Sequence, residues 1–207
     1  MSARAARLLN AAGLLGLSAI LLVAFGYQFL KGELPCPLCL LQRAAFAAAG
    51  VGLALNVCVG SRPAHYAITI FSAVAGALIA GRQVLLHIVP GSEAYGSALF
   101  GLHFYTWALI AFMLTVCAAG FMLLFESQFI VVPEQHGRMP LRAEDDSTVR
   151  RHRQNDRLAR HIGTTAVLLF LVLVLANAAL TFAECGVGLC PDNPSSYQLF
   201  SGSGGKQ

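Results

Sequence analysis

The chain has 207 residues, of which 57% are hydrophobic and only 12% are charged. An average soluble domain has about 25% charged residues and roughly 45–50% apolar ones, so this composition excludes an ordinary soluble protein and is typical of a membrane protein. The net charge of +4 does not indicate nucleic-acid binding, because the basic residues lie in particular loops and not in a patch interleaved with aromatic residues.

Five segments are long and apolar enough to cross a bilayer, which takes about 20 helical residues. They lie near residues 8–30, 42–60, 65–86, 104–125 and 163–183. The first is too long for the apolar part of a signal peptide and is followed by further spans, so we expect it to be retained. The sequence predicts an all-α membrane protein, in which a four-helix transmembrane bundle is joined by a fifth transmembrane helix.

The positions of the arginines predict the orientation in the membrane. Arg4 and Arg7 precede the first span, Arg62 lies between the second and third, and seven further arginines lie between the fourth and fifth. With five spans these regions share one face, and basic loops favour the cytoplasmic side. We therefore expect a cytoplasmic N-terminus and a C-terminus on the outer side of the membrane.

The same pattern predicts four regions. Residues 1–125 form the bundle, 126–162 a charged cytoplasmic loop that is partly helical before the fifth span, 163–183 the fifth helix, and 184–207 a periplasmic arm. Aromatic residues between the third and fourth spans suit a membrane interface, where an amphipathic helix lying flat is one interpretation. A lining for a cofactor pocket is the other.

Four of the six cysteines form two close pairs on the same predicted outer face. Cys36 and Cys39 lie between the first two spans, and Cys185 and Cys190 follow the fifth. In a bacterial inner membrane this face meets the oxidising compartment, where disulfides form and persist. The placement of both pairs on this face is the strongest inference that spacing and hydropathy allow.

Three kinds of site fit these pairs: redox-active dithiols, structural disulfides, or a zinc site made by all four thiolates. A c-type haem site is excluded for the first pair, because Leu40 stands where the motif requires histidine. The other two cysteines, Cys58 and Cys117, fall within predicted helices, and we expect them to be small buried residues in helix packing.

The sequence around the first pair favours the redox interpretation. Pro35 and Pro37 stiffen the loop and remove two backbone donors. Cys39 stands near the start of the second span, where the helix N-terminus favours a thiolate. Arg43 follows four residues later on the same helical face and adds a permanent cation. A thiolate at Cys39 would be a good leaving group in thiol–disulfide exchange.

Arg43 also needs a partner in or near the hydrocarbon layer. It can extend to lipid phosphates, or it can hold the polar head group of a lipid-soluble cofactor and polarise its carbonyl oxygen. Arg82 and His87, near the outer end of the third span, are further polar candidates at the same depth. The alternatives for these two are a residue reaching the interface and a histidine wetted by water.

The stretch CPLCLLQR, residues 36–43, resembles the active-site loop of the DsbB family of bacterial disulfide bond formation proteins. The matching features are the C-x-x-C after the first span, the Gln-Arg leading into the second, and the arginine and histidine that close the third. The resemblance covers roughly residues 8–125. It implies a four-helix bundle in which a membrane quinone, ubiquinone or menaquinone, oxidises Cys36 and Cys39, with Cys39 nearest the quinone, Arg43 on its oxygen and His87 as a pocket neighbour.

The resemblance further implies a periplasmic DsbA-like partner of thioredoxin fold, which the protein reoxidises. Typical members carry their second cysteine pair between the third and fourth spans, whereas here Cys185 and Cys190 follow an extra helix. This pair is therefore either a relocated catalytic shuttle or a structural disulfide. The predicted electron path runs from the partner to Cys185 and Cys190, then to Cys36 and Cys39, then to quinone. The alternatives are a metal-binding or structural membrane protein that uses four outer thiols, and the same chemistry run in reverse.

Overall fold

The computed structural model describes residues 1–88, 98–129, 146–186, 188, 190 and 197–199. These residues form five long helices, a one-turn 3-10 helix and a two-stranded hairpin. The elements are α1 (Ala3–Leu30), α2 (Pro37–Val59), α3 (Pro63–Leu86), β1 (Ala98–Leu99), β2 (Leu102–His103), α4 (Phe104–Leu123), η1 (Glu126–Gln128) and α5 (Asp146–Cys185). Each of the five α-helices contains a segment long and apolar enough to cross a membrane, which confirms the predicted fold class.

Residues with special backbone preferences mark the helix ends. The Ser2 hydroxyl caps α1 by accepting from the backbone N–H of Ala5 at 3.2 Å. Proline occupies the first position of both α2 and α3, where its missing N–H removes no helical hydrogen bond. Gly60 ends α2 with a φ of 97°, a conformation open to glycine but unfavourable for other residues.

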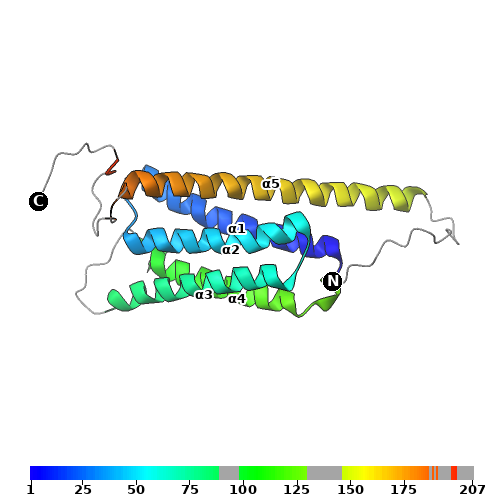
Figure 1. The fold of residues 1–207 in the computed structure, drawn as a ribbon, viewed down its shortest axis with the longest axis horizontal. Helices are drawn as coiled ribbons and strands as arrows, with labels where there is room; N and C mark the ends of the chain where they lie inside the picture. The colour runs from blue at the N-terminus through cyan, green and yellow to red at the C-terminus, as the bar shows by residue number, and fades with distance from the viewer. Residues whose placement is uncertain (89–97, 130–145, 187, 189, 191–196, 200–207) are drawn as a thin grey trace, which may run out of the picture.

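The helices run alternately up and down, and α5 packs against α1 and α2 on one side of the bundle (Figure 1). α2 packs on α1 and α3, and α3 packs on α4. α1 and α4 meet through their side chains, where the rings of Tyr27 and Phe104 lie edge to face with centroids 4.5 Å apart. The core between the helices contains a stacked ring pair, Phe46 and Phe112, with centroids 3.8 Å apart. Gly76 makes room for the Phe112 ring, because a side chain there would meet it.

A buried polar network fixes the end of the bundle where α1 begins. Asn10 donates to the hydroxyl of Tyr66 at 2.7 Å and accepts from Asn56 at 3.0 Å. Tyr66 in turn donates to Gln128 at 3.0 Å. These bonds join α1, α2, α3 and η1, and a satisfied network of this kind specifies one packing arrangement.

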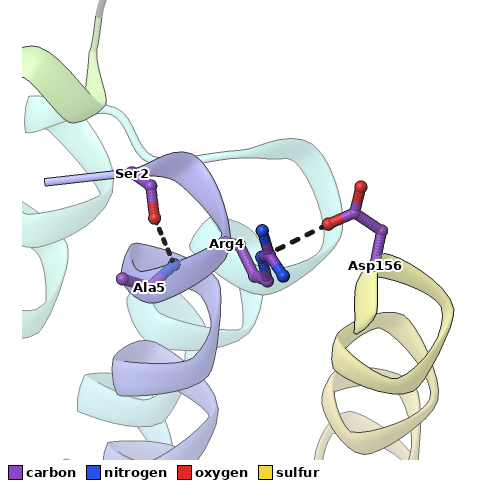
Figure 2. Close-up of polar contacts among 4 residues, drawn as sticks. All are labelled: Ser2, Arg4, Ala5 and Asp156. Atoms are coloured by element: carbon purple, nitrogen blue, oxygen red, sulfur yellow. Dashed lines mark hydrogen bonds and ion pairs between the residues drawn. The ribbon is translucent and has the colours of Figure 1, made fainter. Parts of the chain in front are cut away.

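α5 begins well before the predicted fifth span, because charged sequence that we expected to be mainly loop continues the helix. Its first part projects past the other helices at the end where α1 begins (Figure 1). Arg4 of α1 pairs there with Asp156 of α5 at 3.4 Å, close to the Ser2 cap, as Figure 2 shows. Both side chains are partly exposed, so this ion pair contributes little stability, about 0–1 kcal/mol.

Two expectations about individual segments were wrong or only partly testable. Cys58 and Cys117 are free and exposed on the helix surfaces, not buried between helices. Cysteine is small and apolar, and it is tolerated on a surface that faces lipid as well as in a core. Residues 98–103 form a tight hairpin with Gly101 at φ 80°, and not an amphipathic helix. Residues 89–97 lie outside the described part of the chain.

Candidate active site at the CPLC loop

The CPLC loop forms the first turn of α2. Cys36 is the N-cap residue, and its Sγ accepts from the backbone N–H of Cys39 at 3.2 Å. Pro37 begins the helix, so the sequence places the two sulfurs together at its N-terminus, where they form a disulfide. Cys36 is 6% exposed and Cys39 is half-buried. The positive end of the helix dipole thus acts directly on this pair.

Two buried glutamines, Gln42 of α2 and Gln83 of α3, form a chain of amides that ends at the two sulfurs. The amide of Gln83 donates to Cys36 Sγ at 3.3 Å and to Cys39 Sγ at 3.7 Å. Its own oxygen accepts from Gln42 of α2 at 2.7 Å. A donor aimed at sulfur stabilises a thiolate more than a disulfide, because the thiolate carries the charge. This chain of amides therefore favours the reduced form of the pair.

Arg43 lies one turn below Cys39 and faces α1. Its Nη1 donates to Gln28 Oε1 at 2.6 Å, and its Nη2 donates to the carbonyl oxygen of Ala24 at 3.1 Å. The guanidinium also lies 5.5 Å from the ring centroid of Phe25. These contacts hold the cation inside the protein, so it does not extend to lipid phosphates as one of our two interpretations proposed.

A cavity of about 360 Å³ opens beside these residues, between α1, α2 and α4. Its polar groups come from Gln28, Glu33, Cys39, Gln42, Arg43 and Gln83. The remaining wall is apolar and includes Ala24, Tyr27, Leu34, Phe46, Phe104 and Trp107. Because Trp107 is 37% exposed, the cavity reaches the outer surface of the bundle, which is a lipid-facing surface in a membrane.

α5 ends at the same end of the bundle at which α2 begins (Figure 1). Cys185 is the last residue of α5, is 5% exposed and forms a disulfide with Cys190. The chain then folds back, since the N–H of Leu199 donates to the carbonyl of Ala183 at 3.1 Å. Gln28, the partner of Arg43, also donates to the hydroxyl of Tyr197 at 3.1 Å. One side chain of α1 therefore connects the arm to Arg43.

The two remaining candidates from the sequence do not line this cavity. Arg82 is exposed on the surface of α3. His87 ends α3, where its Nδ1 lies 2.8 Å from the carbonyl oxygen of Gln83. Its ring stacks on Tyr105, with centroids 5.3 Å apart, and Tyr105 does line the cavity. A cofactor role for Arg82 and His87 stays a prediction, and for His87 it would act through Tyr105.

Several polar residues of the site were not singled out from the sequence. Gln28 and Tyr197 join Arg43 to the arm, and Glu184 is 1% exposed next to Cys185. A carboxylate at the end of an apolar span was a usable signal, because ionisable residues in such spans are commonly functional. Gln28 and Tyr197 carried no comparable signal, since their contacts depend on which helices are neighbours.

For zinc, the arrangement of the thiols matters. Both pairs are present as disulfides. Within the described part of the chain, no three or more His, Cys, Asp or Glu side chains are grouped to hold a metal ion.

The part of the chain that is similar to known proteins contains α1, α2, α3 and the CPLC loop. Residues 6–95 match the family model described as disulfide bond formation protein DsbB. The N-terminal part of the chain is DsbB-like. The resemblance inferred from CPLCLLQR is thus confirmed for these residues, although the match ends before α4 and α5.

Curated relatives agree with the family match. Two proteins named disulfide bond formation protein B, from Xylella fastidiosa strains Temecula1 and 9a5c, are each 36% identical to this chain over 83 residues. The aligned part is 38% of this chain and 48% of each relative, so the chain spans about half the length of the curated relatives it matches. No solved structure matches the chain. Cys185, Cys190 and Glu184 lie outside the family match.

Replacing Gln83 tests whether its amide stabilises the reduced form of the Cys36–Cys39 pair. In Gln83→Leu the donor to both sulfurs is lost, and one hydrogen bond is typically worth about 1 kcal/mol net. We expect the reduction potential of the Cys36–Cys39 pair to fall by about 20 mV, measured by equilibration with glutathione buffers and thiol trapping. Ser18→Ala, which removes a buried hydrogen bond within α1, should leave the potential unchanged. An unchanged or higher potential in Gln83→Leu would contradict this role.

Proposed function

We propose that this protein is a quinone-dependent thiol oxidoreductase of the bacterial inner membrane. It reoxidises a periplasmic DsbA-like protein of thioredoxin fold and passes the electrons to a membrane quinone. The observation that carries the proposal is the cavity in which Cys39 and Arg43 meet apolar walls. The DsbB-like match over residues 6–95, which contains both residues, supports it.

The residues around the cavity fit a quinone. The apolar walls suit a ring and the start of an isoprenoid tail, and the side chains of Arg43 and Gln42 supply donors for a ring oxygen. When bound, a quinone accepts two electrons and two protons and leaves as the hydroquinone. The protein's own contribution is to hold Cys39 as a thiolate against the cavity, through the helix N-terminus, the guanidinium of Arg43 and the amide of Gln83.

The proposed exchange steps conserve electrons and protons. A thiolate of the reduced partner attacks the Cys185–Cys190 disulfide and forms a mixed disulfide with one of these cysteines. The partner's second thiolate then attacks its own sulfur in the mixed disulfide, so the partner leaves oxidised and Cys185 and Cys190 remain as a dithiol. The resulting dithiol then attacks the Cys36–Cys39 disulfide in the same way. Cys39 is the better leaving group there, because its thiolate has the three stabilising contacts. Each exchange moves two electrons and two protons toward the cavity.

Burial suggests which sulfurs are attacked. Cys185 is buried, whereas Cys190 is half-buried and is therefore the more accessible sulfur of the arm. We propose that the partner attacks Cys190 and that Cys185 carries electrons inward. The arm and the CPLC loop would lie on the periplasmic side, with the arginine-rich segments and the N-terminus in the cytoplasm.

The test is anaerobic mixing of full-length protein in detergent with a reduced thioredoxin-fold oxidase and a soluble ubiquinone analogue. We expect one molecule of quinone to be reduced for each partner disulfide formed, followed by ultraviolet absorbance and thiol trapping. A partner variant that lacks its second cysteine should instead be trapped as a mixed disulfide on Cys190, with Cys185 released as a thiol, because no second partner thiol is present to displace Cys190. If partner thiols are not oxidised, or are oxidised without loss of quinone, the proposed function is wrong.

A further inference from the structure

Glu184 is a buried carboxylate in the last turn of α5, directly before Cys185. The residue is 1% exposed, and its Oε2 has no hydrogen-bond partner among the described residues. Burying a carboxylate is costly unless a cation or a set of donors compensates for the lost water. An ionisable group at the end of a membrane span therefore needs a partner. Glu184 itself lies beyond the DsbB-like match, which ends at residue 95.

Among the described residues, Arg43 is the cation that acts on Glu184. Arg43 is close enough to interact with it electrostatically, and Tyr197 of the arm is the other titratable group that interacts with Arg43. The direct hydrogen bonds of Arg43 go to Gln28 and Ala24, so the two charges interact through space and not as a contact ion pair.

Glu184 is not part of the cavity wall, whereas Arg43 is. Glu184 therefore does not contact a molecule bound in the cavity, and its route to the site is the electrostatic interaction with Arg43. Glu33 is the one carboxylate among the residues that line the cavity, and it belongs to the loop between α1 and α2. Glu184, unlike Glu33, belongs to α5, and this helix lies outside the family match.

We propose that Glu184 is the countercharge of Arg43, and that this pair joins the fifth helix to the CPLC loop and sets the reactivity of Cys39. Glu184 acts through Arg43 and is a positioning residue. The inference rests on the proposed function only in taking Cys39 as the reactive sulfur. Because Glu184 adjoins Cys185, the pair also connects the second disulfide to the first by a charge interaction.

The sign of the effect follows from electrostatics. The cation of Arg43 stabilises a thiolate at Cys39, and the anion of Glu184 offsets part of that cation. Removing the carboxylate should therefore leave more thiolate at Cys39, whereas removing the guanidinium should leave less. With Arg43 absent, a buried and uncompensated Glu184 is expected to be neutral, so its replacement should then change nothing.

The experiment measures alkylation of Cys39 in full-length protein that has been reduced in detergent, without quinone or partner. Iodoacetamide is added in short pulses between pH 5 and 9, and peptide mapping by mass spectrometry counts the label on Cys39. Glu184→Gln should alkylate about three- to tenfold faster than the unmodified protein at pH 6. Arg43→Gln should alkylate more slowly by a similar factor, and Glu184→Asp, which keeps the charge, should stay within about twofold.

The double variant decides whether Glu184 acts through Arg43. Glu184→Gln combined with Arg43→Gln should alkylate like Arg43→Gln alone. The proposal is overturned if Glu184→Gln is unchanged or slower, or if it accelerates alkylation equally with and without Arg43. If Glu184 and Arg43 had only a structural role, both single variants would change the rate of Cys39 alkylation in the same direction. They would not give one faster and one slower rate.

A stability measurement covers the case in which a single variant does not fold. Without Arg43, the buried Glu184 has to take up a proton that the unfolded chain does not hold at neutral pH, and this costs folding free energy. The double variant should therefore have a higher melting temperature than Arg43→Gln, measured in detergent, although Cys39 alkylation is the same in both. A double variant less stable than Arg43→Gln would overturn the pairing. These outcomes do not depend on quinone reduction. If turnover fails while alkylation behaves as described, the proposed function is wrong and the Arg43–Glu184 pairing stands.

Discussion

Replacing Cys39 by serine is expected to lower quinone-dependent oxidation of the partner by about a thousandfold or more. The serine hydroxyl remains protonated where a thiol forms a thiolate, and it cannot form a disulfide with Cys36, so the electron path ends at the cavity. The measurement is steady-state partner oxidation under anaerobic conditions with a soluble quinone analogue. Cys36 should remain reactive to thiol reagents in this variant, since only its disulfide partner is lost.

Cys58 and Cys117 supply matched controls for Cys39, because each is a free cysteine in a spanning helix away from the cavity. Cys58→Ser and Cys117→Ser should retain turnover within about twofold. A Cys39→Ser protein that oxidises its partner at the normal rate would show that the CPLC loop is not the exit for electrons.

Replacing Arg43 by glutamine is expected to raise the KM for quinone by about 10- to 100-fold. A charge-assisted hydrogen bond contributes about 1.5–3 kcal/mol, and each 1.36 kcal/mol corresponds to a factor of ten. Turnover should fall as well, because the Cys39 thiolate loses its nearest cation. The measurement is initial rate against quinone concentration at saturating partner. Arg43→Lys should recover part of the activity, since lysine keeps the charge. It lacks the two guanidinium nitrogens that donate to Gln28 and to Ala24 at the same time.

Loss of Arg43 also removes a structural contact, so the kinetic result needs a stability control. Thermal unfolding in detergent should establish a temperature at which both proteins are folded, and the kinetics should be compared there. Adding Glu184→Gln to Arg43→Gln should restore stability without restoring the KM. A KM for quinone that does not change in Arg43→Gln would contradict a role for this residue in binding the cofactor.

Hydropathy was sufficient to predict the spans because the length and apolar content of a membrane helix are fixed by the bilayer. Cys39 and Arg43 could be paired from sequence for a similar reason. Both lie on the first turns of one helix, so their separation depends only on helix geometry. The structure adds that Cys36 caps this helix and that Arg43 bends away from lipid toward Gln28.

Contacts between helices could not be predicted in this way. The cavity depends on how α1, α2 and α4 are arranged, and the contacts of Gln28, Tyr197 and Glu184 depend on α5 packing beside α1. Neither follows from the hydropathy of a single segment. The error at Cys58 has the same origin, because hydropathy does not distinguish a residue that faces lipid from one that faces another helix.

A single-turnover measurement tests the exit of electrons most directly. Full-length protein is reduced, freed of reductant and mixed anaerobically with excess ubiquinone analogue, without partner, and the new disulfides are mapped by mass spectrometry. The account predicts that one quinone is reduced for the first disulfide formed, and that this disulfide joins Cys36 to Cys39 before any forms between Cys185 and Cys190. Quinone reduction that leaves Cys36 and Cys39 as thiols, or no quinone reduction at all, would contradict it.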